Sequence, residues 1–147
     1  MRVLIGISHP KQVHMFKNLI YALEKNGDEY VVIVNDKDIT SDLLHSFNIK
    51  FIKIGKNKKG VFQKLIQLIY LTIRSIIISF RFKPDIFVGQ AIPHLGFASF
   101  IYRKPFLIFE DTESSKYLQM LVNPFASAII TPDGYWEIKK STITIKG

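Results

Sequence analysis

Two histidines stand five residues apart in the stretch GISHPKQVHMF (6–16), which follows the first apolar run of the chain. An imidazole near the start of a helix can donate a hydrogen bond to a phosphate or accept a proton from a hydroxyl group. The stretch has a single glycine, unlike the glycine-rich loops that hold dinucleotides. We therefore predict that His14 contacts a phosphate or acts as a base, and that Ser8, His9 and Gln12 bind ligand.

A second polar stretch, EDTESS (110–115), follows another short apolar run. Clustered carboxylates raise one another's pKa, which makes Asp111 or Glu113 a candidate base, with Thr112 between them as a binding group. The alternative is that Thr112 or Ser114 caps a helix and that the acidic side chains favour its dipole.

A third polar stretch follows the apolar run at 85–89 and contains Gln90 and His94, which we predict to bind ligand, for example a phosphate. Three of the four histidines thus come shortly after predicted strands. The fourth, His45, lies inside a predicted helix, where we expect it on the surface.

Short β-type runs alternate with helical segments, which is the pattern of a parallel sheet with helical crossovers. The predicted strands are 2–7, 30–34, 50–54, 85–89, 106–109 and 127–131, with a seventh at 141–146. The predicted helices are 14–27, 38–47, 61–82, 93–103 and 114–125.

Right-handed crossovers between these elements predict an α/β, Rossmann-like, doubly wound parallel sheet of six or seven strands in one domain, residues 1–147. The predicted strand order is 3-2-1-4-5-6, with the switch point between the first and fourth strands. Ligands bind such sheets beyond the carboxyl ends of the strands at that point, where the three polar stretches would converge.

Several kinds of site are excluded by the sequence. It contains no G-x-G-x-x-G after the first strand, no P-loop motif and no G-x-S-x-G motif. No H-x-x-x-H or H-E-x-x-H spacing supports a metal, so we predict neither a metal nor a cofactor. The absence of cysteine and of a recognisable signal peptide favours a cytoplasmic location.

The formal net charge of +8 suggests an anionic partner, although a biased base composition of the coding sequence is an alternative source of lysine. Lysines gather just before the long apolar segment 61–82, and we predict membrane contact through Lys56, Lys58 and Lys59. The alternative is that 61–82 is a core helix next to a solvated basic loop. Nucleic acid is not expected, because no aromatic residues are interleaved with these lysines.

The segments ISHPKQVHMFKNLIYALEKNGDEYVV, KPDIFVGQAIPHLGFASFIYRKPFLIFEDTE and ASAIITPDGYW resemble an uncharacterised archaeal and bacterial family with a GT-B glycosyltransferase-like fold, related to the UDP-N-acetylglucosamine 2-epimerases. The resemblance runs through the whole chain. It implies that this chain is the N-terminal, acceptor-side domain, and that the C-terminal nucleotide-sugar domain is absent, because family members are about twice as long.

The resemblance implies the acceptor-binding half of a GT-B-like glycosyltransferase, inactive alone and completed by a C-terminal domain or a separate subunit. The acceptor would be a sugar or a lipid-linked molecule, with the protein peripheral at the inner face of the cell membrane. One alternative is half of a 2-epimerase-like enzyme, with Glu110, Asp111 and Glu113 as acid/base candidates. Another is a non-enzymatic truncated or binding domain, and an exposed interdomain face also predicts self-association.

Overall fold

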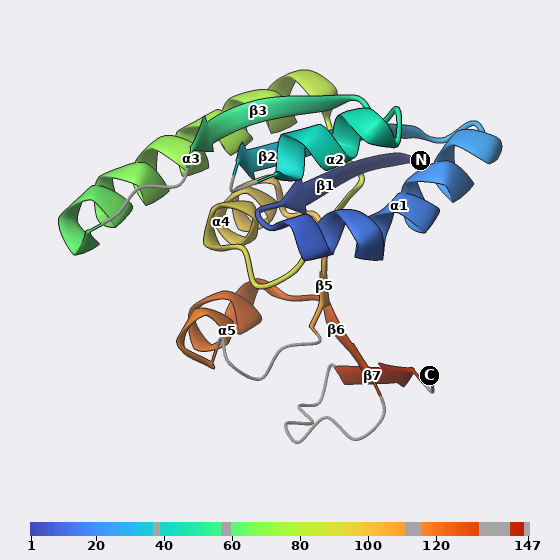
Figure 1. The fold of residues 1–147 in the computed structure, drawn as a ribbon. Helices are drawn as coiled ribbons and strands as arrows, with labels where there is room; N and C mark the ends of the chain where they lie inside the picture. Colours follow the sequence, from blue (N-terminus) through green and yellow to red (C-terminus); the bar gives the residue numbers. More distant parts are fainter. Residues whose placement is uncertain (37–38, 57–59, 111–115, 133–141, 146–147) are drawn as a thin grey trace.

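A computed structural model of the chain describes residues 1–36, 39–56, 60–110, 116–132 and 142–145. Its strands form one parallel sheet in the order β3-β2-β1-β4-β5-β6-β7 (Figure 1). The strands are β1 (Arg2–Ile7), β2 (Glu29–Asp36), β3 (Phe51–Lys56), β4 (Ile86–Gly89), β5 (Phe106–Phe109), β6 (Ala128–Pro132) and β7 (Thr142–Ile145). The predicted fold class, strand order and switch point between β1 and β4 are confirmed, and the seventh strand pairs with β6.

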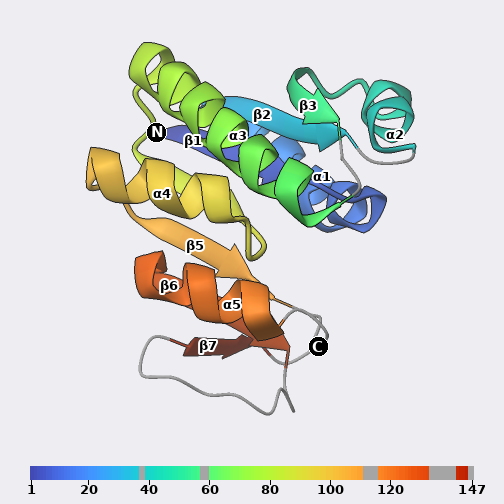
Figure 2. The same cartoon turned by 90° about the vertical axis from the view of Figure 1, so that its left-hand side faces the viewer.

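Helices cover both faces of the sheet. They are α1 (Pro10–Lys25), α2 (Thr40–Ser46), α3 (Val61–Phe82), α4 (Pro93–Tyr102) and α5 (Lys116–Val122), followed by the 3-10 turn η2 (Asn123–Phe125). Figure 2 shows α3, α4 and α5 as one layer in front of the strands, with α1 and α2 behind them. The sheet is therefore enclosed between two helical layers, as the doubly wound prediction requires.

Alternate residues of β1 supply the two cores. Val3, Ile5 and Ile7 face the α1 and α2 layer, where they meet a buried cluster that includes Phe16. Leu4 faces the other layer and belongs to the cluster around α3, α4 and α5. Burial on both faces explains why the strand is continuously apolar rather than alternating.

Helix α1 begins four residues earlier than the sequence pattern predicts. Pro10 occupies its first turn, and the His9 side chain caps the helix by accepting a hydrogen bond from the Lys11 backbone N–H at 3.3 Å. Gly27, at φ +73°, supplies the predicted stop. His14 consequently lies in the second turn of α1, beyond the free N–H groups of the helix start.

Gly6 allows α4 to approach the sheet closely. A Cβ atom at this position would lie 2.2 Å from Leu95 Cδ1 and 3.2 Å from Ile92 Cδ1. The helix that starts at the switch point thus packs onto β1 where β1 has no side chain.

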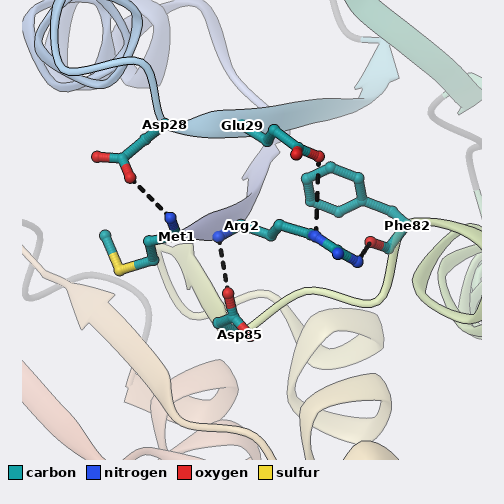
Figure 3. A network of polar contacts seen from close by, with 6 residues as sticks. All are labelled: Met1, Arg2, Asp28, Glu29, Phe82 and Asp85. Carbon is teal, nitrogen blue, oxygen red and sulfur yellow. Dashed lines mark hydrogen bonds and ion pairs between the residues drawn. The ribbon is translucent and has the colours of Figure 1, made fainter.

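A polar network fixes the amino ends of β1 and β4 on the edge opposite the switch-point loops (Figure 3). The Met1 ammonium group lies 2.8 Å from an Asp28 carboxylate oxygen, which raises the pKa of the ammonium group. The Arg2 backbone N–H donates to Asp85 Oδ2 at 2.9 Å, and its guanidinium donates to the carbonyl oxygen of Phe82 at 3.2 Å. This last bond attaches the carboxyl end of α3 to β1.

Candidate functional site

A cavity of about 790 Å³ lies at the carboxyl ends of the strands, at the predicted switch point. Its walls come from the loops after β1 and β4, the end of β5, and the helices α1, α3, α4 and α5. Its polar lining residues are Ser8, His9, Lys11, Gln12, Asn35, Lys64, Gln67, Gln90, His94 and Glu110. Its apolar lining residues are Leu68, Leu71, Ala91, Ile92, Pro93, Leu118 and Leu121.

A chain of hydrogen bonds crosses the switch point. Gln12 Oε1 accepts from the Ser8 backbone N–H at 2.6 Å, and Gln12 Nε2 donates to Gln90 Oε1 at 2.7 Å. Gln12 is 5% exposed, so its amide mainly joins the β1 loop to the β4 loop. Gln12 thus positions Ser8 and Gln90 at the cavity wall.

The two histidines that line the cavity differ in their surroundings. His9 is exposed, and its Nδ1 accepts the Lys11 N–H, so the proton of the neutral ring is on Nε2. His94 is 4% exposed, and its Nδ1 lies 2.9 Å from Ser75 Oγ of α3. Burial lowers the pKa of His94 to about 4, so this ring is neutral at pH 7 and offers hydrogen bonds rather than charge to a ligand.

Glu110 brings a carboxylate into the cavity directly after β5. It is 4% exposed, and its backbone N–H donates to the Ile130 carbonyl oxygen at 2.9 Å, which anchors the end of β5 to β6. A buried carboxylate at a cavity wall has the placement required of a general acid or base.

The first half of α3 contributes residues that the sequence pattern did not place at the site. Gln67 Nε2 donates to the Lys56 carbonyl oxygen at 2.5 Å and to Asn35 Oδ1 at 3.2 Å. Lys64, one turn earlier, also lines the cavity. The sequence shows Gln67 and Lys64 as polar residues in the first half of this mainly apolar helix, but it does not show which of them faces the sheet.

Several predicted site residues lie elsewhere. His14 is exposed on α1, is not among the cavity-lining residues, and packs edge-on against Phe47 with ring centroids 5.6 Å apart. Lys56 is exposed at the end of β3. The remaining predicted residues, Asp111, Thr112, Glu113, Lys58 and Lys59, lie outside the described residues.

The buried His94 makes stability depend on pH. The unfolded chain takes up a proton near pH 6.5, whereas the folded chain takes it up only near pH 4, so the free energy of unfolding falls as the pH drops through this window. From pH 7 to pH 4.5 the loss due to His94 should be about 2 to 3 kcal/mol. Urea unfolding measured at both pH values should show that the free energy of unfolding of His94→Gln falls less than that of the parent chain, by about that amount. Equal decreases in the two proteins would contradict the buried neutral ring.

Several solved structures share this fold. MurG from Acinetobacter baumannii is 15% identical with a TM-score of 0.79, and the match covers 100% of this chain and 45% of MurG. The UDP-GlcNAc 2-epimerase from Methanocaldococcus jannaschii is 15% identical with a TM-score of 0.69, and the match covers 90% of this chain and 39% of the epimerase. These similarities establish the fold, which is that of GT-B proteins.

A curated relative is similar in sequence. The uncharacterized protein MJ0665 from Methanocaldococcus jannaschii is 27% identical over 130 residues, which is 88% of this chain and 38% of the relative. This chain therefore spans less than half the length of the relatives that it matches. Residues 1–144 match the family described as Protein of unknown function (DUF354), and the chain belongs to that family.

Proposed function

We propose that this chain is the N-terminal, acceptor-side half of a two-domain GT-B-fold glycosyltransferase. The observation that supports the proposal best is the switch-point cavity, which combines four side-chain amides, two imidazoles and a buried carboxylate. A second domain, on the same polypeptide or on a separate subunit, would supply the nucleotide-sugar site, since this chain spans about half the length of its structural relatives.

The chemistry of the cavity suits a carbohydrate. Each amide of Gln or Asn carries both donors and acceptors, as does each hydroxyl group of a sugar. The aliphatic lining side chains provide an apolar wall for the C–H groups of a sugar ring. Lys11 and Lys64, both exposed at the cavity, would attract a phosphate on the acceptor.

The roles that we propose follow the position of each side chain. Gln90 and His9 bind acceptor hydroxyl groups, while His94 donates or accepts through its Nε2. Glu110, Asp111 or Glu113 takes the proton of the attacking hydroxyl group. His14, which lies away from the cavity, would need contact with the second domain to take part. The chain alone should show no turnover.

Binding of a sugar phosphate by the isolated chain tests this half of the proposal. Titration with N-acetylglucosamine 1-phosphate, followed by ¹H–¹⁵N NMR, should shift the amide signals of Ser8, Gln12 and Gln90. Gln90→Met, which removes one hydrogen-bonding amide at similar volume, should weaken binding about five-fold. Gln63→Met is the matched control, because Gln63 is exposed on α3 and lies outside the cavity lining.

The opposite assignment has a clear result. Micromolar binding of UDP by the isolated chain, with sugar phosphate adding nothing, would mean that this is the nucleotide-binding half. Unchanged affinity of the Gln90→Met variant for the sugar phosphate would mean that the cavity does not bind the acceptor.

A 2-epimerase-like half is the second candidate, and the buried Glu110 favours it. Epimerisation of a sugar bound to UDP needs a carboxylate that takes and returns protons in a shielded site, and Glu110 is 4% exposed at the cavity. Release of a 2-epimerised sugar from UDP-N-acetylglucosamine without an added acceptor would distinguish this reaction from transfer.

A further inference from the structure

Helix α3 buries mostly polar side chains against the sheet and exposes many large apolar ones. Its buried positions recur every four residues, and three of the four side chains are polar: Gln67, Leu71, Ser75 and Ser79. Its outer surface exposes large apolar side chains, with exposed fractions between 44% and 88%. They are Val61, Phe62, Leu65, Ile66, Ile69, Tyr70, Ile73, Ile77 and Phe80. A helix that covers a sheet in water normally has the reverse arrangement.

Specific hydrogen bonds hold the helix in this orientation. Gln67 is bonded to β2 and β3 through Asn35 and Lys56, and Ser75 is bonded to His94 of α4. The Tyr102 hydroxyl donates to the Ile76 carbonyl oxygen at 3.1 Å. Turning the apolar face inward would break these bonds, so the outward apolar face is part of the folded structure.

The net positive charge of the protein comes from a longer stretch that includes α3. Residues 43–84 contain nine Lys and Arg and no Asp or Glu, whereas the rest of the chain contains eleven basic and twelve acidic residues. Lys64, Arg81 and Lys83 are exposed on and just after α3, and Lys53 and Lys56 are exposed on the neighbouring edge strand β3. Basic side chains therefore flank the apolar face.

A groove beside α3 combines the two kinds of group. It has a volume of about 560 Å³ and lies between the second half of α3 and strands β2 and β3. Arg74 and Arg81 line it together with aliphatic side chains that include Ile52 and Ile77. Guanidinium groups above an aliphatic floor suit a phosphate headgroup with its acyl chain.

These observations decide between occupants of the face. A second copy of the chain would bring two acid-free basic segments together, with no carboxylate on either α3 to pair with them. The helix is long and apolar enough to span a bilayer, but spanning would remove it from the sheet and place Arg74 in the hydrocarbon core. Lying flat on a bilayer keeps the hydrogen bonds and pairs every flanking cation with an anionic lipid.

We propose that α3 is a peripheral docking surface for membranes rich in anionic phospholipid. The exposed isoleucines and phenylalanines enter the interface between headgroups and acyl chains, while the flanking lysines and arginines contact lipid phosphates. Figure 2 shows that α3 lies across the front of the outer helical layer, where a flat surface can reach it. The proposal does not depend on what the switch-point cavity binds.

Co-sedimentation with vesicles tests the proposal on the chain itself. We expect binding to phosphatidylcholine vesicles that contain about 40 mol% phosphatidylglycerol to exceed binding to pure phosphatidylcholine at least about ten-fold, since each basic residue near an anionic surface contributes about five-fold. Raising the salt from about 50 to about 500 mM should weaken it strongly. A chain that stays in the supernatant at low salt with anionic vesicles, or binds neutral vesicles equally well, would overturn the proposal.

Matched variants separate the apolar and the charged parts. The double change Ile69→Gln and Ile73→Gln should reduce partition at least about ten-fold, because two exposed isoleucines no longer enter the bilayer. Ile39→Gln is its control, since Ile39 is 56% exposed next to α2 in the opposite layer. Arg74→Gln with Arg81→Gln should also cost at least about ten-fold, whereas Lys25→Gln on α1 should not. Equal losses in control and test variants would contradict docking through α3.

Sedimentation equilibrium without lipid addresses the second copy. One outcome is that the parent chain forms a dimer that the Ile69→Gln and Ile73→Gln changes dissociate, and that it does not bind anionic vesicles. In that case the exposed face of α3 is a protein interface and the membrane proposal is wrong. A monomer that binds anionic vesicles supports it. Thermal unfolding of each variant shows that the changes at exposed positions leave the fold intact.

Discussion

Replacing Gly6 by Val should destabilise the protein by about 1 to 3 kcal/mol, because the added side chain overpacks the core. The first added carbon would lie 2.2 Å from Leu95 Cδ1, and both residues are fully enclosed between β1 and α4. Leu95 Cδ1 is the end of a flexible side chain, but Leu95 is fully buried, so turning it away from position 6 would push it against its core neighbours on α4 and the sheet. Urea unfolding of the variant, monitored by circular dichroism, measures the loss.

A second substitution tests the cause. Leu95→Ala alone should cost about 3 kcal/mol, because it leaves a cavity in the core. In the Gly6→Val background the same change removes the clash, so the double variant should be more stable than the sum of the single losses predicts. Strictly additive losses would mean that Leu95 is not what excludes a side chain at position 6.

If the chain is half of a two-domain enzyme, as proposed above, replacing Glu110 by Gln should reduce the turnover of that enzyme by about 10² to 10⁴. Gln keeps the volume and hydrogen-bonding capacity of the buried side chain but cannot carry a proton between substrate and solvent. We expect kcat to fall and KM to change little, measured as UDP release in the presence of acceptor and as epimer release in its absence. The reaction that is lost identifies the chemistry.

Thr131→Val is the matched control for Glu110→Gln. Thr131 is 2% exposed on the neighbouring strand β6, its hydroxyl has no hydrogen-bond partner among the described residues, and it does not line the cavity. Its replacement should leave kcat unchanged. If Glu110→Gln keeps kcat within about three-fold of the parent, a difference well below a proton-transfer contribution, then Glu110 is not the acid or base.

The sequence predicts the inner strands of the sheet well because they are buried on both faces. Runs such as RVLIGI (2–7) have no alternation, and this requires helices on both sides and parallel neighbours. The strand order then follows from right-handed crossovers. The ends of β2 and β3 differ from prediction by two residues, because polar residues such as Lys56 continue the ladder at the sheet edge.

The site is predicted less completely. The loops after β1 and β4 meet as expected, because topology alone places them together, and Gln12 joins them to each other. The direction of His14 depends on where α1 begins, and the cap formed by His9 moves that point four residues back. The contribution of α3 is not readable from its sequence, because polar side chains lie on both its buried side (Gln67) and its exposed side (Lys64), so the pattern does not reveal which side faces the sheet.

The place of β1 in the sheet has a consequence for the order of folding. β1 is made before the other strands, yet it lies inside the sheet, paired with β2 on one edge and with β4 on the other. The β2 edge can close as soon as the first β–α–β unit, β1 to β2, leaves the ribosome, but the β4 edge closes only later, since the contact of Arg2 with Asp85 spans 83 residues. At about 5 to 20 residues per second, the half-made chain presents an open, apolar strand edge for several seconds. That edge is where a chaperone would protect the nascent protein, and where two unfinished chains would first pair with each other.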